Sequence, residues 1–316
     1  MSETQTQASA SRRLMPWRTV AVIIAVFAAA VGATVILFGP DMAPVALAGV
    51  MVGLFGTLFG TRYLALAAAG AALAATGFGL AVPGWAGTAI AIGAMTGLLG
   101  READRSGSKT FVFGIMAWII LVAPAAAGGG WMMVAVFATA TAFGIGVAIM
   151  LGAEARIPLA PHVPGYGMAL GIATATGLAL AFAIAANFDG THTQWIALMF
   201  AARGLDAPGS HRKKAVRTGL GAMAGAAAAG AVLALPLPSI AVTAAGLVMF
   251  VLGLRLLPAQ SPLSPAFVSA AIILATAPDT AAADFRIMAA AIAAGLAVSL
   301  NWAIGAASRL FSTRKI

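Results

Sequence analysis

The chain has 316 residues, of which 61% are hydrophobic and only 9% are charged, and it contains no cysteine. A water-soluble domain of this size carries roughly 25% charged residues, so the composition excludes a soluble globular protein. The formal net charge of +9 does not predict a nucleic-acid partner, because in a membrane protein the placement of charges matters more than their sum. We therefore expect an all-α polytopic membrane protein without disulfide bonds or thiolate metal sites.

Apolar segments follow one another along the whole chain. A helix needs about 20 apolar residues to cross the hydrocarbon layer of a bilayer. Twelve segments are predicted as membrane helices, at 19–38, 43–60, 63–82, 84–100, 110–126, 131–152, 166–186, 192–202, 216–235, 238–257, 265–277 and 286–308. Only tails and short connections remain, which excludes a separate catalytic, nucleotide-binding or receptor domain. Any function then resides in the helix bundle itself.

The two halves of the chain resemble each other. A shift of about 155 residues brings similar features together; Arg62 opens the third segment and Arg217 opens the ninth. This predicts two six-helix repeats. The predicted parts are an N-terminal tail (1–18), the first repeat (19–152), a Pro-rich linker (153–165), the second repeat (166–308) and a C-terminal tail (309–316). Because six is even, the repeats share one orientation and are related by an axis along the membrane normal.

The basic residues predict the orientation. If the N-terminus lies in the cytoplasm, every lysine and arginine except Arg286 falls in a tail or connection on the cytoplasmic side. This agrees with the positive-inside rule. We expect a multi-pass protein of a bacterial-type inner membrane with both termini in the cytoplasm.

Four segments are short or interrupted. The segments 192–202 and 265–277 are too short to span a bilayer comfortably. Their counterparts by repeat are 43–60, with Gly53, Gly56 and Gly60, and 110–126, which ends close to Pro124. Broken helices are tolerated at membrane depth where protein or a water-filled cavity covers them. We expect these four segments to line a pathway; ordinary helices extended by polar flanks are the alternative.

The second half carries motifs similar to those of a known family. They are Gln194-Trp195-Ile196-Ala197-Leu198 in a short helix, the basic turn His211-Arg212-Lys213-Lys214-Ala215-Val216-Arg217 before a Gly/Ala-rich helix, and the stretch from Asp284-Phe285-Arg286 to Ser299-Leu300-Asn301-Trp302. This resembles the fusaric acid resistance (FUSC-like) family of membrane transporters, which includes aromatic acid exporters. The large soluble cytoplasmic region of many members is absent here, and Met199-Phe200-Ala201-Ala202-Arg203 replaces the usual Gln-Pro ending of the second helix. The resemblance implies export or permeation of organic anions, often aromatic carboxylates.

Three arginines are candidates for binding such an anion, because the guanidinium fork binds a carboxylate bidentately. Arg286 is the one basic residue on the predicted outer face. It is either an anion-binding residue at the outer mouth or a surface or ion-paired arginine balanced by Asp284 or Asp279. Arg62 and Arg217 occupy matching positions on the inner side, where anchoring to the membrane surface explains them equally well.

Polar and aromatic side chains supply further candidates. Trp195 next to Gln194 and His192 would suit an aromatic acid, although tryptophan belts at membrane interfaces give the same pattern. Asn301 lies on the inner part of the last segment, where it either lines the path or bonds a neighbouring helix.

Carboxylates avoid the middle of every predicted segment. Proton-coupled transporters usually carry an intramembrane carboxylate or histidine, so coupling would depend on Asp41, Asp189 or His192 near the outer mouth. Phosphate-loop and zinc-helix motifs are absent from the sequence, so we expect no enzyme, metal or cofactor. The predicted function is an exporter of small organic anions. An uncoupled anion channel and a structural membrane protein are the alternatives, and a homo-oligomer is left open.

Overall fold

All secondary structure in the described part of this computed structural model is helical. The structure describes residues 14–82, 84–155, 165–188, 194–202, 211–256, 261, 263–276 and 280–312. The elements are α2 (Trp17–Phe38), η1 (Pro40–Met42), α3 (Ala43–Val50), η2 (Met51–Phe55), α4 (Gly56–Phe59), α5 (Arg62–Ala81), α6 (Trp85–Ser106), α7 (Thr110–Ala126), α8 (Gly130–Met150), α9 (Tyr166–Ala185), α10 (Gln194–Ala201), α11 (His211–Leu233), α12 (Ser239–Leu256), α13 (Leu263–Thr276) and α14 (Thr280–Ser312).

Each predicted apolar segment contains a helix, and in the described residues eight helical stretches are long and apolar enough to cross a membrane. The helices α7 and α13 are apolar but shorter, and α10 has only eight residues. The prediction of an all-α multi-pass membrane protein is confirmed at this level. Large apolar side chains such as Ile36, Trp131 and Ile240 are more than three-quarters exposed, as expected for a surface that faces lipid.

Three helix boundaries differ from the sequence prediction. The helix α6 continues to Ser106, so the charged stretch after residue 100 is helical. The helix α11 begins at His211, so the basic turn forms its first turns. The helix α14 begins at Thr280 and runs to Ser312, which includes part of the predicted C-terminal tail. These three segments were predicted too short because only apolar residues were counted. In each case the helix continues through charged residues beyond the hydrocarbon layer.

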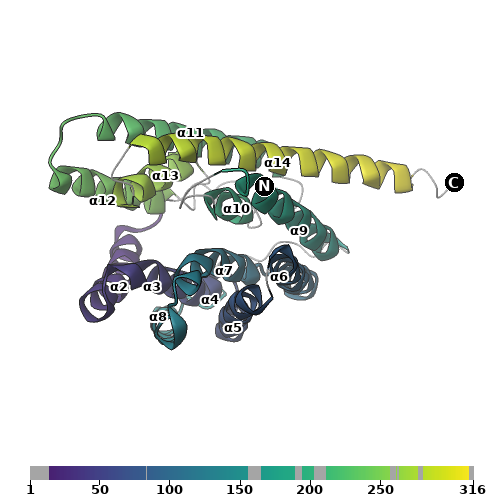
Figure 1. Cartoon of the computed structure of the whole chain (residues 1–316), viewed down its shortest axis with the longest axis horizontal. Helices are drawn as coiled ribbons and strands as arrows, with labels where there is room; N and C mark the ends of the chain where they lie inside the picture. The colour runs from purple at the N-terminus through teal and green to yellow at the C-terminus, as the bar shows by residue number, and fades with distance from the viewer. Residues whose placement is uncertain are drawn as a thin grey trace, which may run out of the picture.

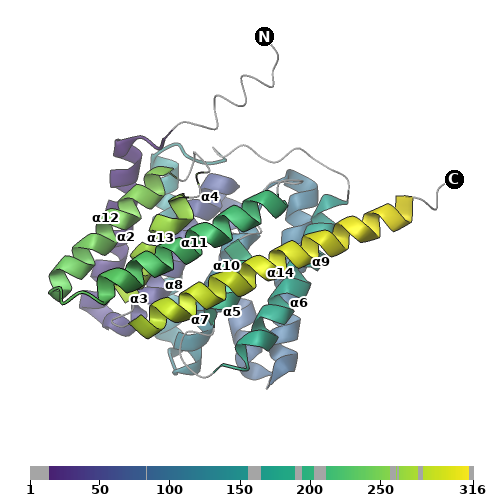
Figure 2. The ribbon, with the colours of Figure 1, turned by 90° about the horizontal axis from the view of Figure 1, so that it is seen from above.

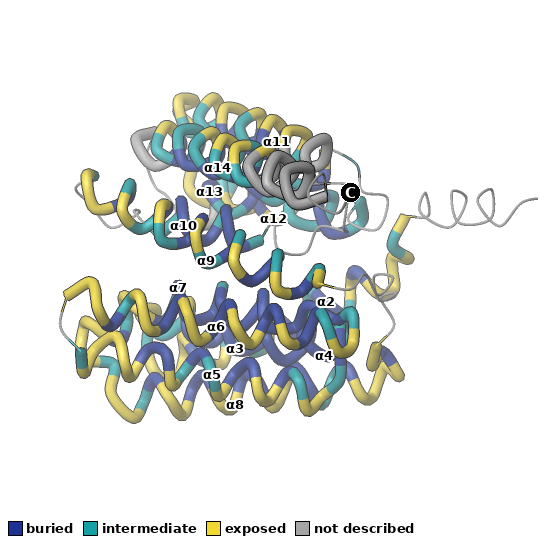
Figure 3. The backbone as a smooth tube through the Cα atoms, turned by 90° about the vertical axis from the view of Figure 1, so that its right-hand side faces the viewer, coloured by how far each residue is buried: buried dark blue, intermediate teal, exposed yellow. Residues whose placement is uncertain are grey.

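The helices form two layers. Figure 1 shows α2 to α8 on one side and α11 to α14 on the other, with α9 and α10 packed between them. The halves meet where α6 packs on α9 and where α7 packs on α10. In Figure 3 the buried positions gather toward the interior of each layer, whereas the outward faces are exposed. Figure 2 shows the long helix α14 crossing over α10 and α9 and projecting past them at its C-terminal end.

Connections predicted on the same side of the membrane lie together at one end of the bundle. Met15 N–H donates to the carbonyl of Arg255 at 2.9 Å, and Ala155 N–H donates to the carbonyl of Gly60 at 3.0 Å. The Ser108 hydroxyl, between α6 and α7, donates to the carbonyl of Phe59 at 2.9 Å. We call this end, which carries the exposed basic residues, the basic end.

A π-helical turn at Met51–Phe55 interrupts the second segment. In an unbroken α-helix, Gly49 and Gly56 would lie on one face, because they are seven residues apart. In the structure a Cβ on Gly49 would lie 2.6 Å from the carbonyl oxygen of Phe137 on α8, whereas one on Gly56 would lie 3.1 Å from the Cβ of Ala65 on α5. The extra residue of a π turn rotates the later part of the helix by about 100°. One segment thus packs closely on α8 before the turn and on α5 after it.

Candidate functional site

Arg286 lies in the second turn of α14, where its side chain is only 3% exposed. Arg286 is therefore not a surface residue, whereas the alternative of an ion-paired arginine stays open. Asp284, two residues earlier, is exposed, and Asp279 lies outside the described residues. A buried arginine in an apolar helix is costly, because burial removes the charge from water, and such residues usually mark a functional site.

The guanidinium of Arg286 stacks on the indole of Trp195. Its Cζ lies 3.2 Å from the ring centroid. Trp195 is the second residue of α10, which packs against both α9 and α14. Such a cation–π contact contributes about 2 kcal/mol when it is shielded from water. Because the guanidinium stacks on the face of the indole ring, its plane is held fixed. A planar guanidinium fork in a fixed orientation can bind a carboxylate bidentately.

Aromatic rings surround this junction of helices. Phe285, the neighbour of Arg286, meets Phe188 edge to face with ring centroids 5.9 Å apart. On α7, Trp118 contacts Phe182 of α9 at 5.6 Å. Trp118 is buried, and its indole N–H has no hydrogen-bond partner among the described residues. Rings from α7, α9, α10 and α14 therefore gather near the end of the bundle opposite the basic end.

The structure says less about the other residues that were predicted to belong to this site. Gln194 begins α10 and is half-buried. Asp41 is exposed in the short turn η1. His192 and Asp189 lie outside the described residues, and Asn301 belongs to α14 without a described side chain.

Arg62 and Arg217 do not join Arg286. Arg62 is exposed at the basic end, where its guanidinium donates to the Tyr63 hydroxyl at 3.2 Å. Arg217 is also exposed. It is 13 residues, or about 20 Å of helix, from Gly230, at which a Cβ would lie 3.3 Å from the Cβ of Ala283 on α14. Both arginines are therefore far from the Arg286–Trp195 pair and do not belong to the same site.

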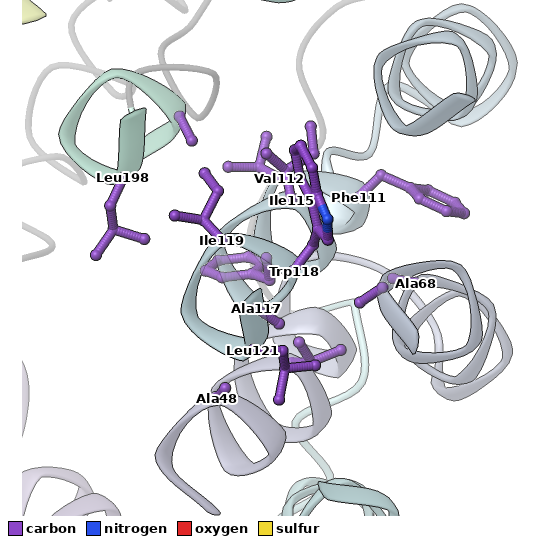
Figure 4. Close-up of a cluster of buried hydrophobic side chains, with 14 of the residues drawn as sticks. Ala48, Ala68, Phe111, Val112, Ile115, Ala117, Trp118, Ile119, Leu121 and Leu198 are labelled. Carbon is purple, nitrogen blue, oxygen red and sulfur yellow. The ribbon is translucent and has the colours of Figure 1, made fainter. Parts of the chain in front are cut away.

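The predicted pathway helices are closely packed in this structure. Figure 4 shows Val112, Ile115, Ile119 and Leu121 of α7 filling the space toward neighbouring helices, near Ala48 of α3 and Leu198 of α10. Ser269 of α13 is buried without a hydrogen-bond partner among the described residues, but several other buried hydroxyls add little polarity, because they donate to their own helix four residues back. Examples are Thr57 to Gly53, Thr141 to Phe137 and Thr174 to Leu170, at 2.7 to 2.8 Å. The core around α7 is thus closed by apolar contacts.

One buried carboxylate near the basic end was not among the candidates that the sequence suggested. Glu102, in the last turns of α6, is 5% exposed. It accepts hydrogen bonds from the Ser108 hydroxyl at 2.6 Å, Thr110 N–H at 2.7 Å and Phe111 N–H at 2.9 Å. A carboxylate at the first N–H groups of a helix satisfies donors that have no partner within the helix. Glu102 thus anchors the start of α7, and the signal present in the sequence was a glutamate eight residues before the threonine that opens an apolar run.

Two further contacts join the first half to the start of α9. Lys109 is 6% exposed and donates from Nζ to the Tyr166 hydroxyl at 3.0 Å. Gly167 N–H donates to the Asp104 carboxylate at 2.7 Å. The loop between α6 and α7 is therefore tied to both repeats. Over the described ranges, no three His, Asp or Glu side chains gather into a group that could hold a metal ion.

No protein-family profile matches the chain, and no curated protein or solved structure matches it. The resemblance to FUSC-like transporters accordingly rests on the sequence motifs alone and stays a prediction.

Proposed function

We propose that this protein is a membrane transporter that exports small organic anions and binds their carboxylate at Arg286. The observation that carries the proposal is the burial of Arg286 against Trp195, with 3% of the arginine exposed. An intramembrane arginine is rare and commonly marks a substrate or ion pathway, and its planar fork suits a carboxylate.

The surrounding rings favour an aromatic carboxylate as the substrate. Trp195 offers an aromatic face against the arginine, the Phe188–Phe285 pair lies on the segments next to it, and ligand sites typically combine apolar walls with a few oriented polar groups. The substrate class agrees with what the FUSC-like resemblance implies. We assign Gln194, at the start of α10, as a polar neighbour in the same site.

The proposed architecture is twelve membrane helices in two parallel six-helix repeats. Some packing partners agree with it. In the first half α3 packs on α2 and α8, and α5 packs on α7; in the second half α10 packs on α9 and α14, and α11 packs on α13. These pairs occupy the same places in the two sets of six helices, whereas the extensive packing of α11 on α14 has no counterpart of similar extent between α5 and α8. Two halves with equivalent pairings could move against each other during transport.

The proposed location is a bacterial-type inner membrane, with the basic end in the cytoplasm. Exposed Arg18, Arg62 and Arg217 share that end, as the positive-inside rule requires. The Arg286–Trp195 pair then lies toward the outer side. Because α7 is closed by apolar contacts in this structure, passage of an anion requires α7 and α10 to separate.

An uncoupled anion channel is the second candidate, and the carboxylates favour it. Glu102 is occupied by the start of α7, while Asp41, Glu154 and Asp284 are exposed. In the part of the chain that the structure describes, no buried carboxylate thus remains to carry protons. A proton-driven carrier would need Asp189 or His192.

Flux measured in proteoliposomes tests the proposal. The purified chain is reconstituted, and efflux of radiolabelled benzoate is followed with and without a pH gradient. We expect protein-dependent flux, which Arg286→Ala reduces by about tenfold or more, because a charge-assisted pair is lost. Arg286→Lys should restore part of it, since lysine keeps the charge without the planar fork. Trp195→Ala should also lower the flux.

Arg18→Ala is the matched control, because Arg18 is exposed at the basic end and belongs to no part of the proposed site. Its flux should equal that of the unmodified protein. Flux that does not saturate and ignores the pH gradient would favour the channel. Absence of flux for any organic anion tested would contradict transport, and unchanged flux in Arg286→Ala would contradict the site.

A further inference from the structure

An open groove lies on the surface of the bundle along the contact between the helices α11 and α14. It has a volume of about 370 Å³ and is lined by Val216, Leu220 and Met223 of α11 and by Ala294, Gly295 and Val298 of α14, among others. The two helices run antiparallel, because Gly230 faces Ala283 at their other ends. The groove is open to the surroundings, since Leu220 is 60% exposed and Val216 is 40% exposed.

The groove begins at the basic end of the bundle. Arg217 is exposed and follows the lining residue Val216 in the first turns of α11, so its long side chain starts within reach of this end of the groove. The first turns of α11 also carry Arg212, Lys213 and Lys214 in sequence, with no acidic residue in the first turn. Trp302 of α14 is 74% exposed and lies one helical turn beyond Val298, on the same face. An exposed tryptophan in a membrane helix typically lies at the level of the lipid headgroups.

Basic residues therefore lie at one end of the groove and apolar residues line its length, in the same order as the headgroup and the acyl chains of a phospholipid. We infer that the groove binds an anionic phospholipid, with its phosphate on Arg217 and one acyl chain between α11 and α14. Arginine binds phosphate through a bidentate fork, and basic pockets between membrane helices bind anionic headgroups. The lining residue of α14 nearest to Arg286 in sequence is Ala291, about 8 Å along the helix; the proposed phosphate position at Arg217 lies at the other end of the groove.

Gly295 gives the site a specific test. A Cβ at this position meets nothing within 4 Å, so Gly295→Leu fills the groove without displacing the backbone. Leu220→Gln is a second variant, which makes the groove polar at an exposed position. Arg217→Ala removes the phosphate ligand, and Arg18→Ala is the control, since it removes an exposed arginine from the same end.

Native mass spectrometry of the full chain in detergent measures the binding. The probes are phosphatidylglycerol, phosphatidylcholine with identical acyl chains, and free glycerol phosphate. We expect phosphatidylglycerol to bind about tenfold or more tightly than phosphatidylcholine and glycerol phosphate not to be retained. Arg217→Ala should abolish the preference for phosphatidylglycerol, Gly295→Leu and Leu220→Gln should weaken binding of both lipids, and Arg18→Ala should change nothing.

Several results would overturn the inference. Equal affinity for the two lipids would remove the headgroup preference, and equal losses in Arg217→Ala and Arg18→Ala would indicate a diffuse charge effect. Binding of glycerol phosphate as tight as that of phosphatidylglycerol would identify a free phosphate site. A dimer that Gly295→Leu dissociates, with lipid binding unchanged, would show that a second copy of the chain occupies the groove.

Discussion

Replacing Glu102 with alanine removes the carboxylate that holds the start of α7. The side chain is buried and accepts three hydrogen bonds, two from the backbone N–H groups of Thr110 and Phe111 and one from the Ser108 hydroxyl. The backbone donors cannot turn toward water, because the end of the helix is fixed by packing. Alanine therefore leaves them without an acceptor.

The size of the effect depends on these three bonds. Each buried donor left without a partner costs about 1–3 kcal/mol, and the Ser108 hydroxyl can still bond to the Phe59 carbonyl. Two stranded N–H groups thus give a loss of about 2–6 kcal/mol. Glu102→Gln should lose less, because its amide oxygen can replace one carboxylate oxygen, while its NH₂ group would face a donor.

Thermal unfolding in detergent, followed by intrinsic tryptophan fluorescence, measures the change. We expect Tm to fall by several degrees or more in Glu102→Ala, since about 1 kcal/mol shifts Tm by about 2–4 °C in proteins of moderate size. Glu154→Ala is the control, because Glu154 is exposed and accepts one backbone hydrogen bond, from Arg62 N–H at 3.0 Å. Equal losses in the two variants would refute the reasoning, as would an unchanged Tm in Glu102→Ala.

Three other predictions test separate features. Gly49→Leu should lower Tm well below that of Gly70→Leu, because a Cβ at Gly49 meets the carbonyl oxygen of Phe137 at 2.6 Å, whereas one at Gly70 meets nothing within 4 Å; equal Tm values would contradict the close approach of α3 and α8. Trp118→Phe should keep or raise Tm, because the buried indole N–H has no partner among the described residues, while Trp118→Ala should cost about 3–5 kcal/mol through the cavity it leaves; a large loss in Trp118→Phe would show that the N–H is bonded. The chain has no cysteine, so Asp41→Cys and Glu154→Cys can be labelled alone. In intact cells an impermeant maleimide should react at residue 41 only, and the reverse pattern would invert the proposed orientation.

Sequence reasoning predicted the positions of the helices well, because apolar runs are a direct consequence of the lipid solvent. It failed where charged residues continue a helix past the apolar run. Arg101 and Glu102 are in α6, although apolarity ends the predicted segment at residue 100. A hydropathy pattern does not reveal such extensions, because charged residues outside the hydrocarbon layer are compatible both with a helix and with a loop.

The site was predicted in part. Arg286 and Trp195 were both candidates, but they were assigned to separate arguments, and the structure brings them into contact. Their pairing depends on how α10 packs against α14, which no local pattern reveals. Arg62 and Arg217 were grouped with them on chemistry alone, and the antiparallel course of α11 and α14 separates Arg217 from Arg286.

The π turn at Met51–Phe55 has a consequence for how this chain can change in length. A π turn is equivalent to a single-residue insertion in an α-helix. Deleting one residue there would restore a regular helix and rotate everything after it by about 100°, so that Gly56 would turn away from Ala65. We therefore expect a shortened second segment to be viable only when a small residue appears at a new position facing α5. In this segment a gain or loss of one residue should alter helix packing more than most substitutions would.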